Sequence, residues 1–86
     1  MIDFTKQALK DLASIAKDKQ GKKDAQRIIE AIKRFDEKGI GDVRPLKGAL
    51  KGKYRLRVGI FRVIFSRQGD TLLIESIDRR KDAYRK

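Results

Sequence analysis

The 86-residue sequence has no cysteine, no histidine and a single proline. The absence of cysteine excludes disulfides and thiolate metal sites, and the absence of histidine removes the commonest metal ligand and acid–base side chain. We therefore expect no metal and no cofactor. Any chemistry has to come from lysine, arginine, tyrosine, carboxylate or hydroxyl side chains.

Long apolar runs are also missing. The first stretch, MIDFTKQALKDL, is charged within three residues, so it has neither the apolar core of a secretory signal nor a membrane span. We expect a cytoplasmic location and no membrane partner. A chain of 86 residues has room for one small core, and we assign residues 1–86 to a single domain.

Acidic residues are few, since 12 Asp and Glu stand against 23 Lys and Arg, which gives a formal net charge of +11. We expect a strongly positive folded surface. Such surfaces attract polyanions, above all nucleic acid, and then anionic membranes or acidic proteins. The alternative is a merely solvated surface, which would bear the self-repulsion of this charge without any use for it.

Two stretches place apolar residues at helical spacing. The first predicted helix spans residues 6–19, and Thr5 stands where an N-cap belongs. We expect Gly21 to interrupt the chain before the second helix, which ends at Lys38 with Gly39 as its C-cap. Two helices joined so closely predict an antiparallel hairpin.

Residues 39–53, GIGDVRPLKGALKGK, include the proline and four glycines, and we interpret them as a connection. Beyond them the apolar residues alternate with other residues, which predicts strands. A two-residue loop at Gly59-Ile60 turns the stretch YRLRVGIFRVIF into a hairpin. Its register gives apolar pairs on one face: Val58 with Phe61, Leu56 with Val63, and Tyr54 with Phe65.

A second loop at Gly69-Asp70 predicts a third strand, in which Ile74 faces Phe65. The expected fold class is therefore α+β. The N-terminal antiparallel helix hairpin packs on one face of a small antiparallel sheet, and this sheet is a three-strand meander. The segment MIDF is a candidate for a short N-terminal edge strand.

The other face of the predicted hairpin carries arginine. The same register sets Arg57 directly across from Arg62, and Arg55 across from Ile64. Like charges opposite one another destabilise a strand pair by up to about 1 kcal/mol, so we expect an anion on this face. The planar arginine fork suits phosphate, which favours a nucleic-acid backbone. In the alternative interpretation the arginines pair with nearby acids such as Glu75, but one glutamate cannot neutralise three arginines.

The C-terminal run IDRRKDAYRK is basic and contains one aromatic residue, Tyr84. Tyr84 either stacks on an unpaired base or packs under the end of the sheet. The PLKGALKGK segment leads directly into the arginine strand, so its lysines are expected to line the same basin. The candidate substrate-binding residues are Arg55, Lys47, Lys53, Arg79 and Lys81.

The order of these segments resembles the RelE/ParE superfamily of toxins from type II toxin–antitoxin pairs, and is closer to its RelE branch. The motifs that carry the resemblance are YRLRVG, FRVIF and the closing RRKDAYR, and it covers essentially the whole chain. For the RelE branch it implies a toxin that enters the ribosomal A site and cleaves messenger RNA. The implied step is attack of a 2′-hydroxyl on the adjacent phosphate, which leaves a 2′,3′-cyclic phosphate.

The resemblance also implies site residues. Arg55 and Arg57 fall where strand lysines stand in the RelE type, and Arg62 falls on the strand arginine. Arg80 falls on the C-terminal arginine and Tyr84 on the stacking tyrosine. The implied catalytic set is therefore Arg57, Arg62, Arg80 and Tyr84.

Two departures from this pattern leave the general base open. Arg79 stands where many members have histidine, and the strand lysines are arginines, which stay protonated and make poor bases. Glu75 is one candidate base, and Lys47 or Lys53 is another if neighbouring cations favour its neutral form. Alternatively, charge stabilisation and alignment of the 2′-hydroxyl supply most of the acceleration.

The missing histidine and lysines also support an alternative from the ParE branch, a toxin that inhibits DNA gyrase by binding and has no nuclease activity. A third interpretation is a basic nucleic-acid-binding module without toxicity. In either toxin interpretation the expected partner is a cognate antitoxin with an acidic, amphipathic segment. We expect that segment to mask Arg57, Arg62 or Arg80, or to displace a C-terminal segment that carries Tyr84. The RelE interpretation adds messenger RNA and the ribosome as partners.

Overall fold

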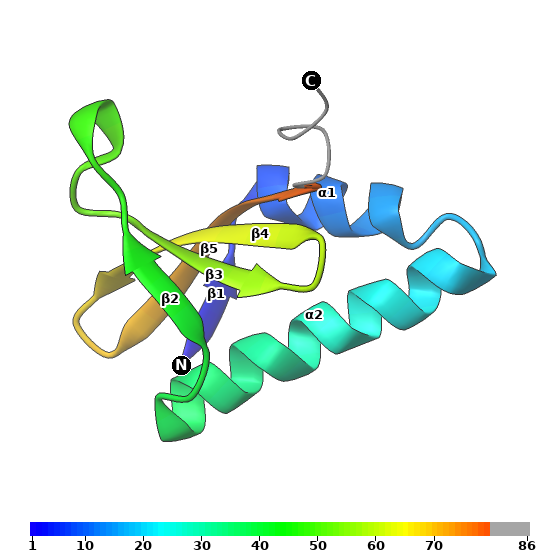
Figure 1. Cartoon of the computed structure of the whole chain (residues 1–86), viewed down its shortest axis with the longest axis horizontal. Helices are drawn as coiled ribbons and strands as arrows, with labels where there is room; N and C mark the ends of the chain where they lie inside the picture. Colours follow the sequence, from blue (N-terminus) through cyan, green and yellow to red (C-terminus); the bar gives the residue numbers. More distant parts are fainter. Residues whose placement is uncertain (80–86) are drawn as a thin grey trace.

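A computed structural model describes residues 1–79, in which two helices pack on one face of a five-stranded sheet (Figure 1). The predicted site residues Arg80, Lys81 and Tyr84 lie outside the described residues. In chain order the elements are β1 (Ile2–Phe4), α1 (Lys6–Ile15), α2 (Lys19–Lys38), β2 (Asp42–Pro45), a short 3-10 helix η1 (Gly48–Leu50), β3 (Tyr54–Val58), β4 (Phe61–Gln68) and β5 (Thr71–Arg79).

The strand order is β1-β5-β4-β3-β2, so strands β2 to β5 form an antiparallel meander and β1 is added at one edge. Strand β1 runs parallel to β5, with Ile2 beside Leu72 and Phe4 beside Ile74. The predicted α+β class and the predicted N-terminal edge strand are confirmed. The sheet is mixed rather than wholly antiparallel, because the two helices carry the chain from β1 back across the sheet (Figure 1).

Strand β2 was not expected. It lies within the segment interpreted as a connection, and it pairs with β3 so that Asp42 faces Arg57 and Arg44 faces Arg55. A strand of four residues that ends in proline is too short to show the alternation of apolar and polar residues by which a strand is predicted. Pro45 is tolerated there because β2 is the edge strand, where a missing ladder donor costs little.

The break between the helices falls earlier than Gly21. Helix α1 ends at Ile15, and α2 begins after Asp18, whose carboxylate accepts a hydrogen bond from the Gly21 N–H at 2.7 Å. Gly21 therefore belongs to the first turn of α2. A Cβ atom at this position would lie 1.8 Å from the Ile15 carbonyl oxygen, so the close approach of the two helices requires glycine.

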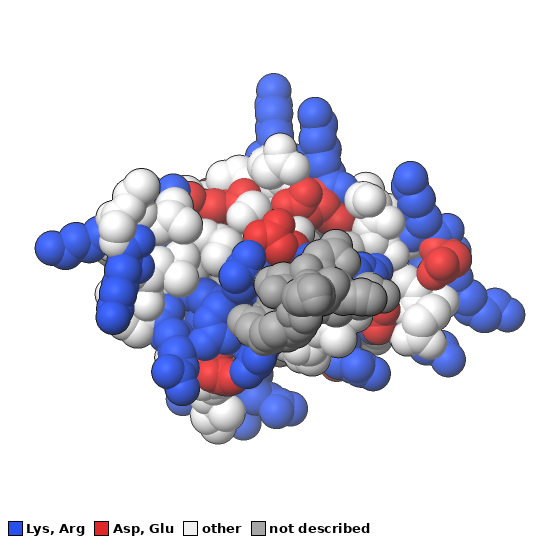
Figure 2. Space-filling model, turned by 45° about the horizontal axis from the view of Figure 1, so that its top comes forward, with Lys and Arg blue, Asp and Glu red and all other residues white. Residues whose placement is uncertain are grey.

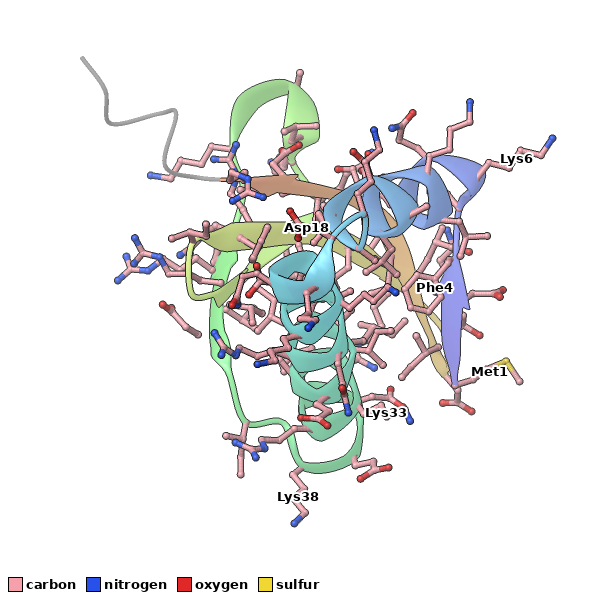
Figure 3. The ribbon with its side chains drawn as sticks, turned by 90° about the vertical axis from the view of Figure 1, so that its right-hand side faces the viewer. Met1, Phe4, Lys6, Asp18, Lys33 and Lys38 are labelled. Atoms are coloured by element: carbon pink, nitrogen blue, oxygen red, sulfur yellow. The ribbon has the colours of Figure 1, made fainter. Side chains whose placement is uncertain are left out.

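The other helix ends agree with the sequence. Thr5 caps α1 by accepting the Ala8 N–H at 3.0 Å, and Gly39 ends α2 with a φ of 69°. The chain reverses between α1 and α2 (Figure 1). Figure 3 shows α2 running from its cap Asp18 to Lys38, with Met1 just before β1 and Phe4 at its end, at one edge of the sheet.

The core lies between the helices and one face of the sheet. Ala8 of α1 and Ile28 and Ile32 of α2 pack against buried residues of the strands. The buried strand residues of this cluster are Leu56, Val58, Phe61, Val63, Phe65, Leu72, Ile74 and Ile77. Every β3–β4 pair of the predicted register is present, and Gly59 has the positive φ, 60°, that the two-residue loop needs.

A bulge changes the register between β4 and β5. Phe65 faces Ile74 as predicted, but Ile64 faces Ser76, so Glu75 is the extra residue. As a consequence Ile77 reaches the core face opposite Val63.

Candidate nucleic-acid interface

The sheet face away from the helices carries the candidate site. Arg57 on β3 and Arg62 on β4 are cross-strand partners, as the sequence predicted. Their side chains are 41% and 37% exposed, so both reach the surface, although the Nε atom of Arg62 is buried and has no hydrogen-bond partner within residues 1–79. Two adjacent cations on an open sheet face form a site that favours an anion between them.

Two aspartates lie beside these arginines. Asp42 on β2 has its carboxylate oxygens 3.9 Å from Arg55 and 3.9 Å from Arg57, and Asp78 on β5 lies 3.6 Å from Arg62. Both aspartates are about half exposed, at 50% and 51%, and their long pairs with the partly exposed Arg57 and Arg62 contribute little energy. The sequence argument that a single glutamate would leave the three arginines unbalanced overlooked Asp42 on the unexpected β2 and Asp78 beyond the bulge, while Glu75 pairs with Lys53.

Arg55 differs from the other two arginines because it is buried, with 8% of its surface exposed. Its Nη1 atom is buried and has no hydrogen-bond partner in the described part of the chain. A buried guanidinium with an unused donor is costly, and Asp42 is the carboxylate nearest to it among the ion pairs of this face. We therefore expect Arg55 to act on a bound phosphate through its charge rather than by direct contact.

Glu75 is held by two donors. Lys53 Nζ lies 2.6 Å from one carboxylate oxygen, and Ser66 Oγ donates to the other at 2.8 Å. The hydrogen bond from Lys53 is the main cause that lowers the pKa of Glu75 below its usual value; burial acts in the opposite direction, while Ser66 and the lysine charge lower it further. The carboxylate is therefore ionised at neutral pH, but a carboxylate with a lowered pKa is a weaker base than a free one.

A pocket of about 310 Å³ opens between the segment that follows β2 and the outer face of the sheet. Its apolar lining comes from Leu46 and Leu50 on one side and Ile64 of β4 on the other. The polar groups among its described lining residues are Lys53, Arg62, Glu75, Ser76 and Asp78. The sequence placed Lys53, Arg62 and Glu75 near one another, but nothing in it indicated the two leucines.

Two predicted substrate-binding residues lie elsewhere. Arg79 faces Phe61 across the β4–β5 pair, and its guanidinium carbon lies 5.1 Å from the centre of that ring. It therefore shares the helix-covered face of Phe61 and does not join Arg57 and Arg62 on the outer face. Lys47 directly precedes η1 and is exposed, but it is not among the described residues that line the pocket.

Figure 2 shows basic side chains around much of the molecule, with acidic groups gathered in the upper middle of the view. Lys and Arg side chains project around its outline, and several gather at the lower left with one acidic group among them. Within residues 1–79, no three acidic side chains come together as metal ligands would. None of the helices in that range has the length and apolar character needed to cross a bilayer.

The fold is that of a family of small toxins. The chain belongs to the family described as the ParE toxin of type II toxin–antitoxin systems, whose family model matches residues 2–84. No protein with a curated description matches the sequence. The resemblance to the RelE/ParE superfamily is therefore confirmed.

Solved structures of toxins from such systems have the same fold. A chain of the YoeB–YefM complex from Staphylococcus aureus is 28% identical to this chain, with a TM-score of 0.75. The match covers 91% of this chain and 93% of the other. The RelB–RelE antitoxin–toxin complex from Methanococcus jannaschii is 26% identical, covers 95% and 94% of the two chains, and has a TM-score of 0.70. YafQ from Escherichia coli shares the fold at 16% identity, with 99% and 98% coverage and a TM-score of 0.72.

Proposed function

We propose that this toxin is an endoribonuclease that cleaves messenger RNA on the ribosome and so stops translation. The observation that carries the proposal is the exposed pair of Arg57 and Arg62, placed side by side across two strands. Such a pair supplies two planar donor groups for the oxygens of one phosphate. Similarity to the complexes that contain YoeB and RelE supports placing the toxin in this branch.

In the proposed reaction, the 2′-oxygen attacks the adjacent phosphorus and the bond to the 5′-oxygen breaks. The products are a 2′,3′-cyclic phosphate and a new 5′-hydroxyl, whose oxygen takes its proton from water. Arg57 and Arg62 stabilise the negative charge that develops on the phosphate oxygens, which is the largest contribution that fixed donors make to such a step. Arg80 and Tyr84 complete the proposed set, with Tyr84 stacking on a base.

The proton of the 2′-hydroxyl needs an acceptor. Glu75 is ionised and lines the pocket beside Arg62, which makes it the candidate base on this face, although Lys53 weakens its basicity. Lys53 is bound to that carboxylate and Lys47 lies off the pocket, so neither is favoured as the base. Alignment of the hydroxyl by the two arginines is the second source of acceleration.

The experiment is to induce the chain in bacteria and map new 5′ ends across the messenger pool. Cuts confined to translated regions and in phase with codons are expected for the wild type and lost in Arg57→Ala and Arg62→Ala. Arg27→Ala is the matched control, because Arg27 is an exposed arginine on α2. Growth arrest without new 5′ ends would overturn the proposal.

One observation favours a second function. The matching family model is that of the ParE toxin, and both strand positions at which the RelE type has lysine are arginine here. A toxin that inhibits DNA gyrase by binding needs no base, and the arginine face would then be a contact surface only. DNA damage with intact messenger RNA after induction would favour this function.

The proposed partner in both cases is a cognate antitoxin with an acidic segment. The carboxylates of Asp42 and Asp78 contact the arginines of the outer face at 3.6 to 3.9 Å. An acidic segment laid across this face would add shorter ion pairs and exclude RNA from it. A complex that leaves Arg57 and Arg62 uncovered, and does not displace the segment carrying Arg80 and Tyr84, would contradict this proposal.

A further inference from the structure

The pocket beneath the segment after β2 has the character of a binding site rather than of a solvated charged surface. Two of its apolar lining residues differ in exposure: Leu50 is 45% exposed and Ile64 is 9% exposed. Its volume, about 310 Å³, lies at the lower end of the range of small-molecule pockets, which begins near 300 Å³. A pocket of this size, with three apolar residues and five polar or charged ones in its lining, suits one flat, uncharged ring system with polar edges that is attached to an anion.

A nucleobase of single-stranded RNA is such a ring. Unpaired bases are bound by packing their faces against side chains and by hydrogen bonds to their edges. Leu46, Leu50 and Ile64 supply the packing surface. Arg62 lines the same pocket and faces Arg57, so the phosphate of the nucleotide whose base enters the pocket lies within reach of the arginine pair.

The polar lining discriminates among the four bases. Lys53 Nζ and the Glu75 carboxylate lie 2.6 Å apart, which places a donor directly beside an acceptor. The Watson–Crick edge of guanine presents an acceptor, O6, followed by two donors, N1–H and N2–H. Each oxygen of the Glu75 carboxylate already accepts one hydrogen bond, from Lys53 or Ser66, and keeps a further lone pair. The carboxylate can therefore accept both guanine donors while the Lys53 ammonium group donates to O6.

The other bases fit this lining less well. In adenine and cytosine the amino group can donate to the carboxylate, but the ring nitrogen beside it is an acceptor. This nitrogen would face the second carboxylate oxygen without a hydrogen between them. Uracil has a single donor between two acceptors. Glu75 is ionised at neutral pH because its pKa is lowered, so it is an acceptor only.

We infer that the pocket lined by Leu46, Leu50, Ile64, Lys53 and Glu75 binds a guanine base of the RNA next to the phosphate held by Arg57 and Arg62. This inference rests on the proposed function, because it makes the pocket a specificity site of the RNA cleavage reaction. Glu75 and Lys53 are then specificity-determining residues, and the base that they select lies next to the cut. A Glu75 carboxylate that holds the guanine edge does not also take the 2′-hydroxyl proton, so with guanine bound this proton passes to water, and the acceleration comes from charge stabilisation and alignment by the arginine pair.

The first test is an NMR titration of the full chain with GMP, AMP, CMP and UMP. We expect saturable amide shifts at Leu50, Ile64 and Ser76, with GMP bound at least about fivefold more tightly than the other three. Glu75→Gln should remove the preference, because an amide offers guanine one acceptor and one misplaced donor. Leu50→Asp should weaken all four nucleotides, and Leu9→Asp, at a 54% exposed leucine of α1, should change none.

Equal binding of the four nucleotides, or shifts confined to the helices, would overturn the inference. The second test uses the mapped cuts. Guanine enriched beside the cuts of the wild type, and lost with Lys53→Met, which lacks the donor to O6, supports the inference. Cuts without such enrichment overturn the inference alone, whereas a wild type that makes no cuts overturns the proposed function and with it the role of the pocket in cleavage.

Discussion

Asp78 lies directly across from Arg62 in the β4–β5 pair, with its carboxylate 3.6 Å from the guanidinium, because the bulge at Glu75 shifts the register by one residue. In an unbroken ladder Ile77 would face Arg62 and leave the core. The bulge thus keeps Ile77 buried and brings a carboxylate to the arginine face.

The arginine pair gives the first prediction. Arg57→Ala and Arg62→Ala should each weaken binding of a labelled single-stranded RNA and lower the slope of log affinity against log salt by about 0.7, which is the value for one lost phosphate contact. Stability should not fall by much, because each change removes one of two like charges. Fluorescence anisotropy at several salt concentrations measures the slope, and Arg27→Ala should leave it unchanged. An unchanged slope in both variants would show that the pair does not bind phosphate.

The two aspartates should differ in their effect on stability. Asp42→Asn leaves the buried Arg55 without its nearest carboxylate among the observed ion pairs, and we expect a loss of about 1–3 kcal/mol in the free energy of unfolding. Asp78→Asn breaks a pair between two exposed groups and should cost less than about 1 kcal/mol. Urea unfolding measures both values. Equal costs would contradict the account of Arg55 as a buried cation.

The Glu75 carboxylate predicts a pH dependence. Its folded-state pKa lies below the usual 4.5, so its contribution to stability is complete above pH 4.5 and is lost as the pH falls through the lowered pKa. Other carboxylates titrate in the same range, so the measurement is the difference in melting temperature between the wild type and Glu75→Gln. We expect this difference to be constant from pH 7 to about pH 5 and to shrink in more acid solution. A difference that does not change with pH would contradict the lowered pKa.

Gly21 gives a prediction about packing. Gly21→Ala places a Cβ atom where the Ile15 carbonyl oxygen already lies, at 1.8 Å, so the helices must move apart. We expect a loss of about 1–3 kcal/mol, the usual cost of overpacking, although alanine is the better helix former. The matched control is Lys22→Ala at the neighbouring exposed position, which should change stability little. Gain of stability in Gly21→Ala would contradict the contact.

The sequence was sufficient for the hairpin that carries the arginines. Gly59 fixed the loop, and only one register paired apolar residues throughout, so the position of Arg57 opposite Arg62 follows from the sequence alone. Thr5 and Gly39 marked helix ends through their capping chemistry. In these cases local chemistry and the apolar pattern point to the same answer.

The remainder of the site depended on long-range pairing. Asp42 approaches Arg55 and Arg57 only because β3 provides a partner for a short edge strand. A signal for the bulge was present in the sequence, since the apolar Ile74 and Ile77 stand three residues apart, and an unbroken strand cannot place both on one face. Burial of Arg55 and the two leucines of the pocket had no such local signal.

The most direct test of the account is a reconstituted reaction with purified ribosomes, a defined messenger RNA and the full chain. We expect cleavage that depends on the ribosome, leaves a 2′,3′-cyclic phosphate and falls by about a hundredfold or more in Arg62→Ala, with Arg27→Ala equal to the wild type. An intact message on ribosomes, together with inhibition of purified gyrase by the same preparation, would contradict the account and make the arginine face a binding surface.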